Sequence, residues 1–126
     1  MVTRRGVTLD TGGLMALERK DKRMRDLIAS ARAAGVSVMV PAPVIIEWWR
    51  AGPGQRAVLE RLTVEPLSER VAKAAGEAIA QLPIATAVDA AVMASAALRG
   101  DVVYTSDMPD LERLQAVFPG VLLMRA

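Results

Sequence analysis

Short apolar runs rich in β-branched residues alternate along this chain with longer stretches of helical periodicity. Val36–Val40 and Val102–Thr105 have the length of strands and are almost entirely apolar. Such runs are typical of parallel strands buried on both faces, and parallel neighbours need a crossover connection that is usually a helix. The sequence therefore predicts one α/β domain over residues 1–126, with a central, mostly parallel sheet of four to five strands and helices on both faces.

Capping and turn residues set the expected element boundaries. Gly35 stands where a helix C-terminus favours glycine, Ser68 and Thr86 are N-cap residues, and Gly100 closes the helix that Thr86 opens. Strands are expected at Val7–Asp10, Val36–Val40, Val102–Thr105 and Val121–Met124, with Thr63–Leu67 as a further extended piece. Helices are expected from near Leu14, and at Lys22–Ala34, Val44–Arg50, Gln55–Leu62, Ser68–Gln81, Thr86–Arg99 and Asp110–Val117.

The composition limits the available chemistry, because the chain contains no histidine and no cysteine. It has no imidazole base, no thiolate nucleophile, no disulfide and neither of the usual zinc ligands. A bound metal would have to be an oxygen-seeking cation, Mg²⁺ or Mn²⁺. The longest uncharged stretch, Ala33–Ile46, is broken by Gly35 and two prolines, and no apolar segment follows the N-terminal arginines. We therefore expect a cytoplasmic protein with no membrane association.

Three acidic residues follow the ends of predicted strands, and a fourth lies at the same edge if its helix begins there. Asp10 closes the first strand, Asp107 follows Val102–Thr105, Glu47 comes shortly after the second strand, and Asp89 lies in the first turn of its helix. Ligands of open parallel sheets bind at the carboxyl ends of the strands. Converging carboxylates repel one another unless a divalent cation neutralises them, and such a cation activates water for attack on a phosphodiester.

Each of these acids also has a purely structural interpretation. Asp10 fits an Asx turn or an N-cap, Asp89 fits the capping-box spacing after Thr86, and Asp107 fits a turn before a helix. Glu47 stands among apolar neighbours that include Trp48 and Trp49. It is expected either in an apolar band, where it would need a cation or ordered water, or on a short solvent-facing arc of its helix.

The order and spacing of these segments resemble the PIN domain, and more closely the VapC-type toxins of type II toxin–antitoxin systems. The resemblance extends from about Val7 to Met124 and is carried by Leu9–Thr11, Pro43–Glu47, Ala87–Ala94 and Val103–Leu111. It implies an endoribonuclease in which Asp10, Glu47, Asp89 and Asp107 bind Mg²⁺ or Mn²⁺ and activate water. Thr105 would order the site and Asp110 would be an accessory acid. It further implies a tRNA or rRNA substrate, a homodimer and a cognate antitoxin.

Two features near the motifs depart from the family pattern or stand outside it. Gly12 occupies a position where many members carry Ser, Thr or Asn, so a supporting hydroxyl is missing or is supplied by Thr11. The Trp48–Trp49 pair either belongs to the core or forms a dimer or antitoxin surface.

Positive charge is concentrated in the first quarter of the chain. Residues 1–32 carry eight Lys or Arg against four Asp or Glu, and Arg4 is among the eight. This charge predicts either a surface that contacts RNA phosphates, with Arg19, Arg23 and Arg25 as candidates, or a solvated helix face.

Other functions fit the sequence less well. A phospho-acceptor receiver domain needs a lysine after a late strand, and this chain has none there. A haloacid-dehalogenase-type phosphatase needs an acid at the position that Gly12 occupies. The remaining alternative is a catalytically silent PIN-like module that binds RNA or protein.

Overall fold

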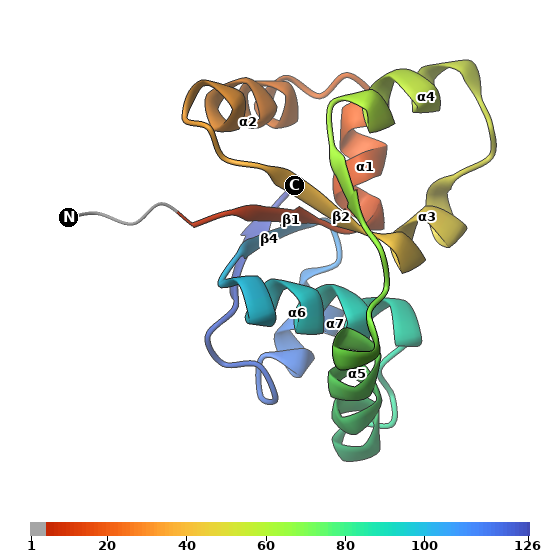
Figure 1. Ribbon diagram of the computed structural model, residues 1–126, viewed down its shortest axis with the longest axis vertical. Helices are drawn as coiled ribbons and strands as arrows, with labels where there is room; N and C mark the ends of the chain where they lie inside the picture. The colour runs from red at the N-terminus through yellow and green to blue at the C-terminus, as the bar shows by residue number, and fades with distance from the viewer. Residues whose placement is uncertain (1–4) are drawn as a thin grey trace.

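Five strands form one parallel sheet in the order β3-β2-β1-β4-β5 (Figure 1). The computed structural model describes residues 5–126. Every neighbouring pair of strands is parallel, so the predicted α/β sheet is confirmed, with five strands. The strands are β1 (Val7–Leu9), β2 (Val38–Pro41), β3 (Thr63–Glu65), β4 (Val102–Thr105) and β5 (Leu122–Arg125).

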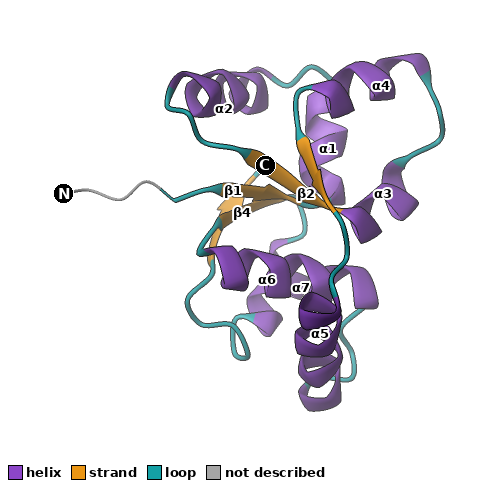
Figure 2. Ribbon diagram, in the orientation of Figure 1, coloured by secondary structure: helices purple, strands orange, loops and turns teal. Residues whose placement is uncertain are grey.

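Helices cover both faces of the sheet (Figure 2). On one side lie α1, α2 and α4, and on the other lie α6 and α7, with α5 packed against α6. Across residues 5–126, none of the helices has the length and apolar character that a membrane crossing requires. The helices are α1 (Thr11–Glu18), α2 (Lys22–Ala33), α3 (Ala42–Trp48), α4 (Pro53–Glu60), α5 (Glu69–Gln81), α6 (Ala87–Arg99) and α7 (Met108–Leu114).

The core is aliphatic and is centred on β1. Leu9, Val40 and Val103, from three adjacent strands, are fully buried, and Leu14 and Met93 cover them from α1 and α6. All three residues of β1 are buried because the strand has a neighbour on each side and a helix on each face. The central position of β1 fixes where the chain that follows it, beginning at Asp10, must lie.

Most boundaries agree with the capping residues, and four helices begin earlier than predicted. Helices α3 and α4 begin at Ala42 and Pro53, ahead of the predicted Val44 and Gln55. Gly35 and Gly100 have left-handed φ angles of 70° and 75°, as expected after helix ends. Helix α1 begins at Thr11 rather than near Leu14, because the Asp10 carboxylate accepts a hydrogen bond from the Gly13 N–H at 3.0 Å. Helix α7 begins at Met108 rather than Asp110, since a proline such as Pro109 is tolerated in the first turn.

A polar network under α6 has no signature in the sequence. The Arg99 guanidinium donates to Asp101 at 2.8 Å and to the Thr8 hydroxyl at 2.7 Å, and it forms an ion pair with Glu65. The Thr8 hydroxyl donates to Asp101 at 2.7 Å. This network ties the end of α6 to β1, β3 and the start of β4. Its inner part is shielded from water, because Asp101 is 3% exposed and Thr8 is fully buried.

Removing Asp101 from this network is expected to destabilise the fold strongly. Asp101→Ala leaves the Arg99 charge and the Thr8 hydroxyl without their shared acceptor, and it should lower the free energy of unfolding by about 3 kcal/mol. Asp26→Ala, which breaks the exposed Lys22–Asp26 pair, serves as the control. It should cost about 0.5 kcal/mol or less. Urea denaturation measures both, and equal losses would contradict the structural role of the network.

Candidate metal centre

Two strand ends meet at the carboxyl edge of the sheet. Leu9 of β1 pairs with Tyr104 of β4, so Asp10 and Thr105 are the next residues on adjacent strands. The buried Thr105 hydroxyl donates to the Asp10 carboxylate and accepts a hydrogen bond from the Asp107 N–H at 2.8 Å. Thr105 therefore holds the start of α1 and the turn before α7 in a fixed relation.

Helix α6 brings a third acidic residue to this edge. Thr86 caps the helix, and its hydroxyl accepts a hydrogen bond from the Asp89 N–H at 3.1 Å. Asp89, Asp107 and Asp110 each offer a carboxylate oxygen, and these three oxygens lie within 4.8 Å of one another. Asp110 also forms an ion pair with Arg113 of its own helix. The cluster thus joins the first turn of α6 to the first turn of α7.

Only some of the acids predicted from the sequence lie together in the structure. Asp89, Asp107 and Asp110 form the cluster, although Asp110 is predicted only as an accessory acid. Asp10 lies close enough to the cluster for its charge to act on Asp89. Glu47, in the last turn of α3, is exposed and is not part of the three-residue group.

Glu47 is connected to the edge through Thr11. Its carboxylate accepts a hydrogen bond from the Thr11 hydroxyl at 2.6 Å, one residue after Asp10. Of its neighbours on α3, Val44 and Trp48 are buried and Ile46 is 78% exposed. The exposed surface of α3 therefore includes Glu47, which corresponds to the solvent-facing alternative and not to the apolar band.

Three carboxyls at this edge are hard to ionise. Burial, supported by the negative charges of Asp107, Asp110 and Asp10, raises the pKa of Asp89 to about 6. The pKa of Asp10 is also raised, mainly by burial, although hydrogen bonds from Thr105 and Gly13 oppose the shift. A hydrogen bond with Asp110 raises the pKa of Asp107. The edge therefore attracts either protons or a cation.

The donor set fits a hard divalent cation. Mg²⁺ binds oxygen at about 2.1 Å, which puts opposite ligands about 4.2 Å apart. Three carboxylate oxygens within 4.8 Å of one another need only small side-chain rotations to reach that separation. Carboxylates and water suit Mg²⁺ and Mn²⁺, and the chain has no imidazole or thiolate that would favour a softer metal.

Gly12 packs directly against the turn between β4 and α7. A Cβ atom at Gly12 would overlap the Ser106 hydroxyl oxygen and lie 2.8 Å from the Ser106 backbone nitrogen. The Ser106 side chain therefore occupies the space that a side chain at position 12 would need. Sequence reasoning missed this contribution of Ser106, because the two residues are far apart in the chain and only the glycine hints at a close approach.

The two tryptophans have different environments. Trp48 is 4% exposed, and its indole N–H donates to Glu18 of α1 at 3.0 Å. Trp49 is half-buried, packs against the core, and lies 6.0 Å from Trp48 between ring centroids. The core interpretation therefore holds fully for Trp48, and Trp49 retains an accessible part.

The predicted RNA-contact arginines come from α1 and α2, and neither helix contributes to the three-residue acidic cluster. Arg19 caps the far end of α1, about 12 Å of helix away from Asp10. Arg25 lines a pocket with Lys20 and residues of α4. The Arg23 guanidinium donates to the Arg125 carbonyl at 3.1 Å, at the end of β5. Arg4 lies outside the described residues.

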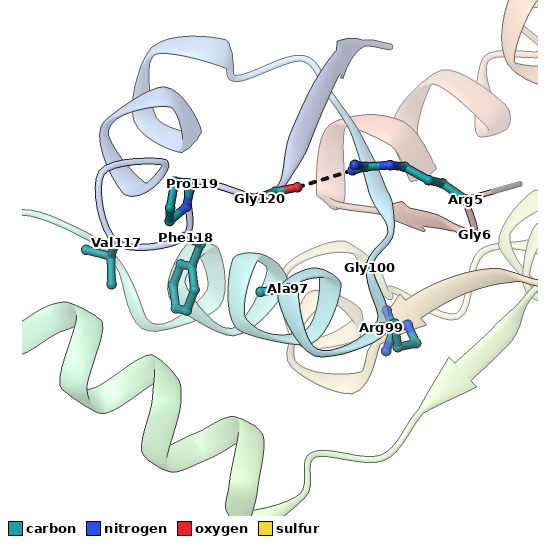
Figure 3. Close-up of a pocket in the computed structure, with 9 residues that line it drawn as sticks. All are labelled: Arg5, Gly6, Ala97, Arg99, Gly100, Val117, Phe118, Pro119 and Gly120. Carbon is teal, nitrogen blue, oxygen red and sulfur yellow. Dashed lines mark hydrogen bonds between the residues drawn. The ribbon is translucent and has the colours of Figure 1, made fainter. Parts of the chain in front are cut away.

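Another pocket lies at the opposite edge of the sheet (Figure 3). Its volume is about 680 Å³, and its lining includes Gly6 and Gly100, which precede β1 and β4. The described residues that line it include no acid, and the guanidinium of Arg99 is already engaged by the network under α6. This pocket offers no carboxylate for metal binding, so the acidic edge is the candidate centre.

Comparisons with known proteins identify the fold. No family model and no curated protein matches the chain. A chain of VapBC2 from Rickettsia felis, bound to a DNA fragment from its promoter, is similar with a TM-score of 0.76 and 14% identity, covering 95% of this chain and 98% of that one. A chain of DNA-bound VapBC from Salmonella typhimurium is similar with a TM-score of 0.74 and 18% identity, covering 97% of this chain and 98% of that one. A chain of a toxin–antitoxin complex from Klebsiella pneumoniae is similar with a TM-score of 0.64 and 18% identity, covering 93% of this chain and 96% of that one.

These similarities extend over nearly the whole length of each chain. At such low identities they show the fold alone. The fold is PIN-like, and the predicted resemblance to VapC-type proteins is confirmed at the level of the fold.

The stability of the metal-free protein is expected to fall as the pH rises. The pKa of Asp89 in the folded state, about 6, lies above its ordinary 3.8, so the folded state binds the proton more tightly than the unfolded state. This stabilisation is complete below pH 3.8 and is lost as the pH rises through about 6. Urea denaturation in EDTA should show the decline, and Asp89→Asn should reduce it.

Added Mg²⁺ should stabilise the protein more at pH 8 than at pH 5, because the cation competes with protons for the same oxygens. Glu69→Gln, at an exposed acid of α5, is the control and should keep the wild-type pH dependence. Equal slopes for wild type and Asp89→Asn in EDTA would contradict the electrostatic description of the site.

Proposed function

We propose that this protein is a divalent-cation-dependent endoribonuclease that cleaves RNA phosphodiesters. The observation that carries the proposal is the group of three carboxylates at the carboxyl edge of the sheet, with Asp10 beside it. Carboxylates that lie close together repel one another, and a bound cation turns that cost into a binding site. The PIN fold supports the same interpretation.

In this proposal Asp89, Asp107 and Asp110 hold Mg²⁺ or Mn²⁺ together with Asp10. The bound cation supplies charge neutralisation at the scissile phosphate and a water of lowered pKa. Thr105 is the positioning residue, because its hydroxyl fixes the Asp10 carboxylate and its oxygen fixes the Asp107 backbone. Glu47 acts at the rim of the site, oriented by Thr11.

The biological role that we propose is that of the toxin in a toxin–antitoxin pair. The similarity to chains of VapBC complexes over more than nine-tenths of this chain supports this role. The cognate antitoxin would be the protein partner, a tRNA or rRNA the substrate, and a homodimer the assembly. Ile46 and Ile84, which are 78% and 71% exposed, are apolar surface that a protein partner would cover.

A second candidate is a catalytically silent module that binds RNA or protein. The observation that favours it is that two of the four predicted ligands, Asp10 and Glu47, lie outside the three-residue group. A silent module would bind RNA equally well with Mg²⁺ and with EDTA, and would cut it in neither.

The wild-type protein is expected to cleave total cellular RNA with Mg²⁺ or Mn²⁺ and to lose that activity in EDTA. Asp89→Asn should reduce cleavage at least about 100-fold while the fold persists, because it removes an anionic ligand without changing side-chain volume. Glu69→Gln should cut like the wild type. Cleaved-end sequencing measures the rate and the sites together. Full activity of Asp89→Asn would overturn the proposed centre.

Expression of the wild-type protein in bacteria is expected to arrest growth. Asp10→Asn should relieve the arrest, since the amide oxygen can still accept the Gly13 hydrogen bond but the charge at the edge is lost. Soluble protein levels must be equal for the two, and the denaturation midpoint verifies that the variant is folded. Normal growth with abundant soluble wild-type protein would contradict the toxin role.

A further inference from the structure

Two adjoining pockets lie between α2 and the strands β4 and β5. One, of about 320 Å³, is lined near the carboxyl edge by Arg23, Met124 and Arg125. The other, of about 300 Å³, continues toward Arg5 near the amino edge. Both share Leu27, Ser30 and Tyr104. We call the two pockets together the α2 groove, defined by Arg5, Arg23, Leu27, Ser30, Tyr104 and Arg125.

The charge of the α2 groove is positive. Arg23 is held by the Arg125 carbonyl at 3.1 Å, and Arg5 by the Gly120 carbonyl at 3.2 Å, as Figure 3 shows for Arg5. Hydrogen bonds to carbonyl groups orient a guanidinium without neutralising it. Asp26 also lines the groove, but it is paired with Lys22 at 2.7 Å. The groove thus offers oriented positive charge at both of its ends.

An aromatic ring lies between these charges. Tyr104 is half-buried, lines both pockets, and is the only tyrosine of the sequence. Aromatic rings on which bases stack, combined with basic side chains that contact the backbone, are the recurrent means of binding single-stranded nucleic acid. An acidic peptide would match the arginines but would leave the ring without a planar partner, so the combination favours RNA.

The carboxyl end of the α2 groove adjoins the acidic edge. Arg125 pairs with Thr105 across β4 and β5, and neighbouring strands lie about 4.8 Å apart. Thr105 in turn donates to Asp10. Side chains alternate along a strand, so Tyr104 faces α2 while Thr105 faces the acids. An RNA strand that passes over the end of β4 would reach from the α2 groove to the acidic edge.

We propose that the α2 groove binds the single-stranded stretch of the substrate RNA next to the cleaved bond, with Arg23 and Arg125 on its phosphates and Tyr104 stacked on a base. The inference rests on the proposed function, because it takes RNA as the substrate. The basic residues that contact RNA would then come from both α2 and β5, and not from the first quarter of the chain alone.

Binding is measured in the Asp89→Asn background with a fluorescent single-stranded RNA. Arg23→Gln/Arg125→Gln should weaken binding at least about tenfold and lower the salt slope by about 1.4, since each single-strand phosphate contact contributes about 0.7. Tyr104→Leu should weaken binding by about 5- to 100-fold, as expected for one stacked base. Tyr104→Phe keeps the ring and should bind within about twofold of the parent protein.

The matched control is Arg56→Gln/Arg70→Gln, which removes the same charge from exposed positions on α4 and α5. It should leave the salt slope nearly unchanged. Denaturation midpoints verify that every variant is folded. If the double variant at Arg23 and Arg125 binds RNA like its control, the proposal is overturned. It is also overturned if that variant retains RNA binding but loses binding of a labelled poly-glutamate peptide.

Failure of the proposed function gives a different pattern. A wild-type protein that never cuts RNA, but whose RNA binding still depends on Arg23, Arg125 and the Tyr104 ring, would support the groove and overturn the nuclease. A wild-type protein that cuts RNA, with groove variants that bind and cut equally well, would support the nuclease and overturn the groove.

Discussion

The hydrogen bond from Thr105 to Asp10 connects the ends of two central strands, and the geometry of the acidic edge depends on it. The parallel pairing of β1 with β4 brings the two residues together, and the same hydroxyl oxygen accepts from the Asp107 N–H. The turn before α7 is thereby held against the start of α1. Gly12 allows this approach, because the Ser106 side chain fills the space beside it. Strand pairing, capping and the positions of the acids are thus one connected arrangement.

The acidic edge opposes the stability that the rest of the fold supplies. Burial is the main cause that raises the pKa of Asp10 and Asp89, and a hydrogen bond with Asp110 is the main cause that raises the pKa of Asp107. Each of the three carboxyls therefore resists ionisation in the absence of a cation. The network of Arg99, Asp101, Glu65 and Thr8 has the opposite character, because its charges are paired and its hydrogen bonds are made. The fold therefore concentrates its unfavourable electrostatics at one edge, as is usual where a protein binds a ligand or performs chemistry.

Local patterns predicted the elements well because strands, helices and caps are encoded by neighbouring residues. Ser68, Thr86 and Gly100 set their boundaries as expected, and Asp10, Asp89 and Asp107 lie at the predicted edge. What the sequence left open or missed depends mostly on contacts between distant residues. The exposure of Glu47, one of its two alternatives, follows from how α3 packs on α1. The start of α1 at Thr11 is a local exception, because the Asp10 side chain that caps this helix binds the nearby Gly13 N–H. The Gly12–Ser106 approach and the α2 groove have no periodicity, so no window of sequence reveals them.

The pairing of β1 with β4 also has a consequence for synthesis of the chain. Asp10 and Thr105 are 95 positions apart, and Asp107 and Asp110 come later still. A nascent polypeptide that has emerged only as far as α5 contains the central strand without the neighbour that completes the acidic edge. Contacts of such long range form late, and the loop that they close carries a large entropy cost. A ribosome translating this message therefore carries no assembled acidic edge until the residues as far as Asp110 have left the exit tunnel.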